Sequence, residues 1–294
     1  MEKMKDMRCA AIHDLSGVGK CSLTVALPVL SACGVETSVL PTAVLSTHTG
    51  GFENYVYIDL TDEMLPIAEH WKSVGVEFES IYTGFLGSAA QIDIVDKIFT
   101  MFQKEDSLII MDPVMGDHGK LYPTYTEEMA SGIAALCHRA DVLVPNMTEA
   151  ARILGIPYQE GPYTQEFIDD LLRQLSDLGP KQVVLTGIWF EEGRLGSACR
   201  DAARDKNGYF MESLIPGYFH GTGDLFSSIL TGGIMNKMDL FTATEVATNT
   251  TWRTIVSTKE QLKDVRFGPK FEQHMPYLSA LMEKARKDLQ AQPK

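Results

Sequence analysis

Leu108-Ile109-Ile110-Met111-Asp112-Pro113-Val114-Met115-Gly116-Asp117 joins a short apolar run to a turn that carries two carboxylates. Four consecutive apolar residues predict a strand that is buried on both faces, which is typical of a parallel sheet covered by helices. In open sheets of this kind, ligands bind beyond the carboxyl ends of the strands. The stretch therefore predicts an α/β fold with an acidic site at one edge of its sheet.

The same alternation of strand and helix patterns extends in both directions from this stretch. Further strands are expected at Cys9–His13, Thr37–Leu45, Ser80–Thr83, Val142–Pro145 and Gln182–Thr186. Helical patterns occupy Ser22–Ala32, Thr61–Lys72, Ala89–Gln103, Thr126–His138, Met147–Leu154 and Thr164–Leu178. This order predicts a mostly parallel sheet with helices on both of its faces.

The pattern changes after Thr186. Two extended segments, Arg194–Arg200 and Tyr209–Ile215, are joined by a polar stretch and predict an antiparallel hairpin at one sheet edge. Three helices are then expected, at Asp224–Asn236, Phe241–Thr258 and Gln273–Lys287. Because no linker-like or repetitive segment divides the chain, residues 1–294 are expected to form a single domain.

The composition is that of an ordinary water-soluble globular protein, with 45% hydrophobic and 22% charged residues in 294. A net charge of −13 argues against nucleic acid and anionic membrane surfaces as partners. An acidic chain that binds an anionic ligand would need a local positive field, which helix N-termini and bound cations can supply.

Cysteine usage and the N-terminal sequence indicate the compartment. The five cysteines are odd in number and form no C-x-x-C pair, so a disulfide framework or a structural zinc site is not expected. The N-terminus lacks the features of a signal peptide, and no window approaches 18 apolar residues. The chain is therefore expected to be cytoplasmic.

The second decisive stretch is His220-Gly221-Thr222-Gly223-Asp224-Leu225-Phe226-Ser227-Ser228. Two glycines and a hydroxyl precede an acid at the start of an apolar helical run. A helix that starts here leaves backbone N–H groups and its positive dipole end open to a phosphate-like anion. Asp224 could orient a hydroxyl nucleophile beside that anion and take its proton, as in phosphoryl transfer to an alcohol. The alternative is an ordinary helix-capping turn.

Four other acidic or amide side chains follow neighbouring strands. Asp112 and Asp117 flank a Pro/Gly turn that could present both carboxylates to Mg²⁺, and the alternative is a plain solvated turn. Asn146 and Glu149 have the spacing of a capping box at a helix start. Glu149 could also face the rim of the sheet and contribute to the Mg²⁺ shell, so both roles can hold together.

Polar loops after the first two strands favour binding of a small polar ring. Ser46, His48 and Thr49 lie on a glycine-rich loop, and we expect His48 to polarise a ligand oxygen rather than bond to backbone. Phe85 could stack on the ring, although an aromatic at a strand end is more often part of the core. Asp14 and Ser16 are expected to contact the edge of the ligand.

The segment Leu15–Ser22 superficially matches a Walker A loop. It fails because Asp14 stands where the motif needs glycine and Cys21 stands where it needs serine or threonine. A P-loop NTPase is therefore excluded, and Lys20 is expected to cap the loop or neutralise phosphate.

With these residues in place, the chain resembles the pyridoxal kinases of the ribokinase-like superfamily from about Arg8 to Ser257. The resemblance rests on five motifs in the same order: Ser46-Thr47-His48-Thr49-Gly50, Tyr82-Thr83-Gly84-Phe85, Asp112–Asp117, Pro145-Asn146-Met147-Thr148-Glu149 and Gly221-Thr222-Gly223-Asp224. It implies a ribokinase-like three-layer α/β/α sandwich with a mostly parallel central sheet and an antiparallel edge hairpin. It also implies phosphorylation, dependent on ATP and Mg²⁺, of the 5′-hydroxymethyl group of B6 vitamers, often by a homodimer.

The resemblance assigns expected roles to single residues. Asp224 matches the catalytic base, and the residues that match the anion hole are Gly221, Thr222 and Gly223. Asp117 and Glu149 match the acids that organise Mg²⁺. The expected ATP-side residues are Asp112, Tyr122, Asn146, Thr186 and Gly187. The expected substrate-side residues are Asp14, Ser16, Ser46, His48, Thr49 and Phe85. A monovalent cation can also take part in such enzymes.

Some features depart from the pattern and leave alternatives open. The opening His13–Gly19 is similar to that of hydroxymethylpyrimidine kinases, whereas the second loop lacks their Gln-Asn-Thr and Phe85 replaces their usual Met. We therefore favour a B6 vitamer over the pyrimidine. A catalytically silent vitamin-binding protein is disfavoured by the intact Asp224, and a sugar kinase by the absence of a long polar lid. Asp224 is expected to have an ordinary pKa of about 3.9.

Overall fold

A single nine-stranded sheet organises the fold. The computed structural model describes residues 7–291. The strands lie in the order β11-β10-β9-β8-β5-β4-β1-β2-β3. Their bounds are β1 Arg8–Ser16, β2 Glu36–Leu45, β3 Tyr57–Asp59, β4 Ser80–Thr83, β5 Leu108–Met111, β8 Val142–Leu143, β9 Gln182–Ile188, β10 Arg194–Asp201 and β11 Lys206–Ser213. A separate small hairpin is formed by β6 (Gly116–Asp117) and β7 (Lys120–Leu121).

The six strands from β9 to β2 pair in parallel, and antiparallel strands close both edges. The predicted hairpin is confirmed, because β10 pairs antiparallel with both β9 and β11. At the opposite edge, β3 pairs antiparallel with β2, in register Val44 to Ile58. β3 was not predicted, because three residues carry too little alternation to indicate a strand.

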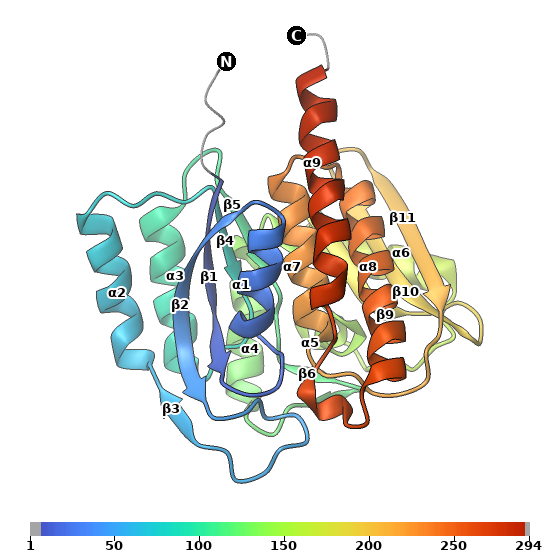
Figure 1. Cartoon of the computed structure of the whole chain (residues 1–294), viewed down its shortest axis with the longest axis horizontal. Helices are drawn as coiled ribbons and strands as arrows, with labels where there is room; N and C mark the ends of the chain where they lie inside the picture. The colour runs from blue at the N-terminus through green and yellow to red at the C-terminus, as the bar shows by residue number, and fades with distance from the viewer. Residues whose placement is uncertain (1–6, 292–294) are drawn as a thin grey trace.

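Helices cover both faces of the sheet (Figure 1). One face carries α1 (Leu23–Ala32), α7 (Thr222–Met235), α8 (Leu240–Gln261) and α9 (Met275–Ala291). The other face carries α2 (Thr61–Ser73), α3 (Ala89–Phe102), α4 (Glu127–Leu136), α5 (Met147–Leu154) and α6 (Gln165–Asp177). Three short 3₁₀ turns complete the described chain: η1 Cys137–Arg139, η2 Val265–Phe267 and η3 Glu272–His274. The predicted three-layer sandwich is confirmed.

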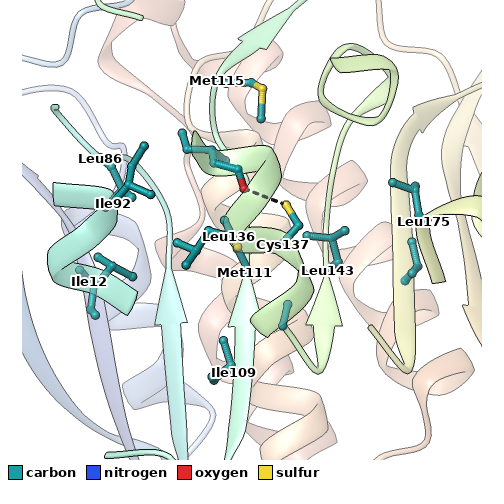
Figure 2. Close-up of a cluster of buried hydrophobic side chains, with 14 of the residues drawn as sticks. Ile12, Leu86, Ile92, Ile109, Met111, Met115, Leu136, Cys137, Leu143 and Leu175 are labelled. Carbon is teal, nitrogen blue, oxygen red and sulfur yellow. Dashed lines mark hydrogen bonds between the residues drawn. The ribbon is translucent and has the colours of Figure 1, made fainter. Parts of the chain in front are cut away.

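The sheet is sandwiched between two apolar cores. Figure 2 shows part of the core on the α2–α6 side, where Ile109 and Met111 of β5 lie among side chains of α3 and α4. Cys137 belongs to this core and donates a hydrogen bond from Sγ to the Ile133 carbonyl at 3.2 Å. On the opposite face of β5, Ile110 belongs to the other core. Burial on both faces explains why this strand is a continuous apolar run.

The parallel strands place their carboxyl ends at one rim. In Figure 1, β1 and β2 point to the end of the molecule opposite the two termini, and α7 starts at that same end. The loops at this rim carry the candidate residues. Within residues 7–291, no helix combines the length and apolar character needed to cross a bilayer.

Candidate active site

The first turn of α7 starts without a side-chain cap. Gly221 is the N-cap residue, with the left-handed angles φ 77° and ψ 4°, and it provides no capping side chain. A Cβ atom at Gly221 would lie 2.0 Å from the Lys20 carbonyl oxygen, so only glycine fits. Thr222 turns its hydroxyl back to the Phe219 carbonyl at 2.9 Å. The N–H groups of the first turn therefore have no side-chain cap and can bind an anion.

Asp224 lies in this first turn and has an unusual acidity. Burial raises the pKa of its carboxyl from 3.8 to about 7, and the nearby Asp112 and Asp14 carboxylates contribute to the rise. A backbone hydrogen bond from Ser22 acts in the opposite direction. The expectation of an ordinary pKa is therefore wrong, because it took no account of desolvation and of the like charges on Asp112 and Asp14.

The carboxylate of Asp112 lies near that of Asp224 and contacts α7. It follows β5 directly and is 7% exposed. Its Oδ2 accepts a hydrogen bond of 2.7 Å from the hydroxyl of Ser227, which is three residues after Asp224 on the same helix. Burial raises the pKa of Asp112 to about 7, while the Ser227 hydroxyl lowers it. The structure therefore brings two predicted carboxylates to one face of α7.

Asn146 and Glu149 form the predicted capping box at the start of α5. The Asn146 Oδ1 accepts from the Thr148 and Glu149 N–H groups at 2.8 and 3.0 Å, and its Nδ2 donates to the Gly116 carbonyl at 2.8 Å. Glu149 accepts from the N–H groups of Asn146 and Met115 at 2.8 and 3.1 Å. The capping role is thus confirmed, and it ties α5 to the Asp117 hairpin.

The carboxylates of Asp117 and Glu149 have the donor atoms that Mg²⁺ prefers. Glu149 is 3% exposed, and burial followed by the Asp112 charge raises its pKa well above the ordinary value. Asp117 is half-exposed on the β6–β7 hairpin and also contributes to that rise. Among residues 7–291, no group of three or more His, Cys, Asp or Glu side chains could hold a metal by itself. An ion here would thus complete its shell with water or phosphate oxygens.

The first loop begins later than predicted. β1 continues past His13 to Ser16, with a register irregularity between His13 and Leu15, so Asp14 and Ser16 lie inside the strand. Both are buried, and the Ser16 hydroxyl donates to Asp14 Oδ2 at 2.8 Å. The Lys20 ammonium donates to the Pro269 carbonyl and pairs with Glu272, which fits the first of its two predicted roles, capping of the loop. Neutralisation of phosphate by Lys20 stays a prediction.

The Ser46–Gly51 loop is held by its own polar side chains. His48 Nε2 lies 2.6 Å from the Arg266 carbonyl oxygen, and its Nδ1 accepts from the Gly50 N–H at 3.0 Å. Both ring nitrogens thus have backbone partners, which contradicts the prediction that His48 polarises a ligand. Ser46 Oγ accepts from the Val56 N–H at 2.9 Å, and Thr49 remains half-exposed beside these contacts.

Three aromatic rings, those of Phe85, Tyr122 and Tyr125, form a wall beside the carboxyl ends of β4 and β5. Phe85 is half-buried and meets Tyr125 edge-on, with ring centroids 5.6 Å apart. Tyr122 packs on the same Tyr125 at 6.4 Å, and its N–H donates to the Met115 carbonyl at 3.0 Å. Tyr122 is therefore anchored to the Asp112–Asp117 loop in this structure. Tyr125 was not predicted, since it has no motif around it.

Thr186 and Gly187 lie inside β9, which continues to Ile188. Thr186 bridges to Asn146, and its N–H donates to the Pro145 carbonyl at 3.0 Å. Gly187 adopts φ 71° and is exposed. The structure therefore places Thr186 beside the capping box, although the strand end itself is two residues later than predicted.

Contacts from the far end of the chain were missed by the sequence analysis. Arg266 and Phe267 of η2 pack on the Ser46–Gly51 side: the Arg266 guanidinium lies 5.2 Å from the Phe52 ring centroid, and Phe267 meets Phe52 at 5.8 Å. Tyr218 and His220 of the segment before α7 were also missed. Arg266, Phe267 and Tyr218 belong to no motif, and His220 opens the Gly221–Asp224 motif without a role of its own in it, so the sequence held no signal for these contacts.

Comparison with known proteins fits this geometry. The family model described as phosphomethylpyrimidine kinase matches residues 26–269. The chain belongs to this kinase family. Among solved structures, a candidate phosphomethylpyrimidine kinase from Bacteroides thetaiotaomicron, crystallised with pyridoxal, is 39% identical, with a TM-score of 0.89 over 93% of this chain and 96% of that chain.

Other relatives of this kinase carry the name of the predicted family. Pyridoxal kinase from Lactobacillus plantarum is 29% identical, with a TM-score of 0.86 over 95% of this chain and 98% of that chain. Pyridoxal kinase from Dictyostelium discoideum is 28% identical over 203 residues, which are 64% of this chain and 65% of that protein. The matched part is thus somewhat less than two thirds of that relative's own length.

Proposed function

We propose that this kinase transfers the γ-phosphoryl group of ATP to the 5′-hydroxymethyl group of a B6 vitamer. The observation that carries the proposal is the uncapped first turn of α7, with Asp224 inside it. This turn combines an anion-binding backbone with a carboxylate that can hold an alcohol. The Bacteroides relative crystallised with pyridoxal supports the choice of acceptor.

In the proposed reaction, the acceptor hydroxyl lies against Asp224 and attacks the γ-phosphorus in line. The new O–P bond forms as the P–O bond to ADP breaks, and the hydroxyl proton passes to Asp224. A pKa of about 7 makes Asp224 a stronger base than an ordinary carboxylate and still leaves it largely ionised slightly above neutral pH. The first N–H groups of α7 hold the charge of the moving phosphoryl group.

Asp117 and Glu149 are the residues that would hold Mg²⁺, directly or through water. The ion would neutralise phosphate charge when bound. Asp112 and Asp14 keep the surroundings of Asp224 negative, and this raises the basicity of Asp224. The wall of Phe85 and Tyr125 is suited to the flat acceptor ring. The need for a monovalent cation remains a prediction of the resemblance.

The test is release of ADP from Mg·ATP with four acceptors side by side: pyridoxal, pyridoxine, pyridoxamine and 4-amino-5-hydroxymethyl-2-methylpyrimidine. We expect strong turnover with at least one B6 vitamer. Turnover of the pyrimidine alone would replace the proposal with a hydroxymethylpyrimidine kinase, which the opening His13–Gly19 favours. Binding of vitamers without any turnover would indicate a silent vitamin-binding protein.

We further propose that the kinase acts as a homodimer through the sheet edge at β3. β3 is the last strand of the sheet, and Val56 and Ile58 are 61% and 53% exposed there. An apolar edge strand of this kind is a template for pairing with a second copy. Light scattering after gel filtration should give twice the chain mass, and Ile58→Asp should give the monomer. A monomeric wild type would refute the proposal.

The five cysteines are free in the structure, in agreement with a reducing compartment. We therefore place the kinase in the cytoplasm, which fractionation of cells that express it would test.

A further inference from the structure

The segment between β11 and α7 connects the Asp117 hairpin to the Ser46–Gly51 loop through two side chains, Tyr218 and His220. The Tyr218 hydroxyl donates to Asp117 Oδ2 at 3.4 Å, and its ring also lies 6.0 Å from that of His118. The Tyr218 ring meets the His220 ring edge-on, with centroids 4.7 Å apart. One end of the segment thus contacts the Asp117 hairpin.

The other end of the segment supports the Ser46–Gly51 loop. The rings of His220 and His48 are 5.2 Å apart. A Cβ atom at Gly50 would lie 2.3 Å from Nδ1 of His220, and its three nearest atoms all belong to that ring. Gly50 does not adopt a positive φ, so the His220 ring, and not backbone strain, is what requires glycine here.

The same segment leads directly into the anion-binding turn, because His220 precedes Gly221. A nucleotide phosphate on the first turn of α7 would therefore constrain the His220 end of this segment. An ion on Asp117 would constrain its Tyr218 end. The contact between Tyr218 and Asp117 is long, and Tyr218 is 46% exposed, so the segment can adjust when these partners are bound. A shift of the His220 ring would then move Gly50, because the ring packs directly against this glycine.

We propose that Tyr218 and His220 are positioning residues that couple the nucleotide side of the site to the acceptor loop, so that bound nucleotide raises the affinity for the acceptor. The proposal rests on the proposed function, because it takes the Ser46–Gly51 loop as the acceptor side. Coupling requires a ligand to favour one arrangement of a shared element, and this segment is the element that both sides contact.

The test compares the dissociation constant of pyridoxal with and without Mg²⁺ and a non-hydrolysable ATP analogue, measured by calorimetry. Coupling between ligands in proteins is typically about 5–150-fold. We expect nucleotide to tighten pyridoxal binding by about 5-fold or more in the wild type, within that range. The ratio should fall to within about 2-fold of unity in His220→Ala and fall by a smaller amount in Tyr218→Phe, which keeps the ring packing but loses the hydroxyl.

His70→Ala is the matched control, since His70 is an exposed histidine on α2, on the opposite face of the sheet from α7. It should keep the wild-type ratio. A ratio that is unchanged in both Tyr218→Phe and His220→Ala would overturn the proposal.

A second experiment tests the contact itself. Gly50→Ala should weaken pyridoxal binding in the wild type, because its methyl group displaces the His220 ring. In the His220→Ala background the space is open, so the same substitution should have a clearly smaller effect. The same cycle, read on the unfolding midpoint of the ligand-free protein, reports on the contact even if one variant folds poorly. If the effects of Gly50→Ala and His220→Ala are additive on both pyridoxal binding and the unfolding midpoint, the contact between Gly50 and His220 is ruled out.

The two proposals can fail separately. If the wild type phosphorylates a vitamer but the coupling ratio is insensitive to Tyr218→Phe and His220→Ala, only the positioning role fails. If no vitamer is phosphorylated and the pyrimidine is, the proposed function fails. The coupling ratio is then measured with the pyrimidine, and its loss or persistence in His220→Ala decides the positioning role.

Discussion

The helices α5 and α7 both start at the active rim of the sheet, yet their first turns are built in opposite ways. α5 satisfies its own N–H groups through the capping box of Asn146 and Glu149. α7 starts at Gly221, which has no side chain to cap it. The two turns therefore suit different roles. The capped turn of α5 fixes the position of the Asp117 hairpin, and the uncapped turn of α7 leaves backbone N–H donors that a ligand could use.

The largest expected effect comes from Asp224→Asn at the open turn. Loss of the proton acceptor should lower kcat by about 10²–10⁴-fold, the usual contribution of a general base. The amide has nearly the same shape as the carboxylate and removes a charge that is costly to bury, so the melting temperature should not fall below that of the wild type. Steady-state kinetics and calorimetry check the two halves of this prediction, and near-normal turnover would refute the role of Asp224.

The next effect compares Gly221→Ala with Gly155→Ala, the left-handed C-cap of α5. Both positions have positive φ, 77° and 65°, which costs a residue with a side chain about 1–3 kcal/mol. Only Gly221 also meets backbone, since nothing lies within 4 Å of a Cβ at Gly155. We expect Gly221→Ala to lose more unfolding free energy than Gly155→Ala. We also expect only Gly221→Ala to lower kcat. Equal losses in denaturant unfolding would contradict the steric argument.

A smaller effect is expected at the closed turn. Asn146→Ala removes the cap of α5 and should lower the unfolding free energy by about 0.5–2 kcal/mol. Thr164→Ala, which removes the cap of α6, is the matched control with a similar loss, since the Thr164 hydroxyl accepts from the Phe167 N–H of its own helix. Because Asn146 also holds the Gly116 carbonyl at 2.8 Å, its variant alone should raise the Mg²⁺ concentration needed for half-maximal turnover. If Asn146→Ala and Thr164→Ala need the same Mg²⁺ concentration, the hydrogen bond from Asn146 to Gly116 does not support the Mg²⁺ site.

The last prediction concerns pH. Asp224 and Asp112 have pKa values raised to about 7 in the folded protein, against ordinary unfolded values, so between about pH 4 and 7 the folded state binds more protons than the unfolded state. Their contribution to stability is therefore present at low pH and is lost as pH rises through about 7. Urea unfolding across this range should show a shallower decline in Asp224→Asn than in the wild type. An identical slope would mean that Asp224 titrates normally.

Much of this architecture could be predicted from local patterns. β4, β5 and α5 have the predicted bounds, because each combines a clear apolar period with an unambiguous start or end. β1 and β9 extend beyond prediction because polar residues such as Asp14 and Thr186 continue the ladder when a neighbouring strand supplies the hydrogen bonds. Strand ends are thus decided by pairing partners, which a local pattern does not contain.

The sequence indicated acids at strand and helix ends, but it did not indicate the electrostatics of the candidate site. The motif around Asp224 indicated an acid at a helix start, whereas its raised pKa depends first on burial and then on the Asp112 and Asp14 carboxylates from distant parts of the chain. His48 was assigned to a ligand because the carbonyl of Arg266, 218 residues away in the sequence, could not be foreseen as its partner. In both cases the missing information was a contact between distant segments.

The sequence by itself determined the alternation of strands and helices, the glycine that opens α7 and the capping box that closes α5. Each depends on residues within a few positions of one another, and backbone geometry links such residues directly. Only the tertiary structure decided which carboxylates share one buried space, which histidine nitrogens are already bonded, and how Tyr218 and His220 connect the acceptor loop to the Asp117 hairpin. These properties depend on distance and desolvation in space, which the packing of the two helical layers sets.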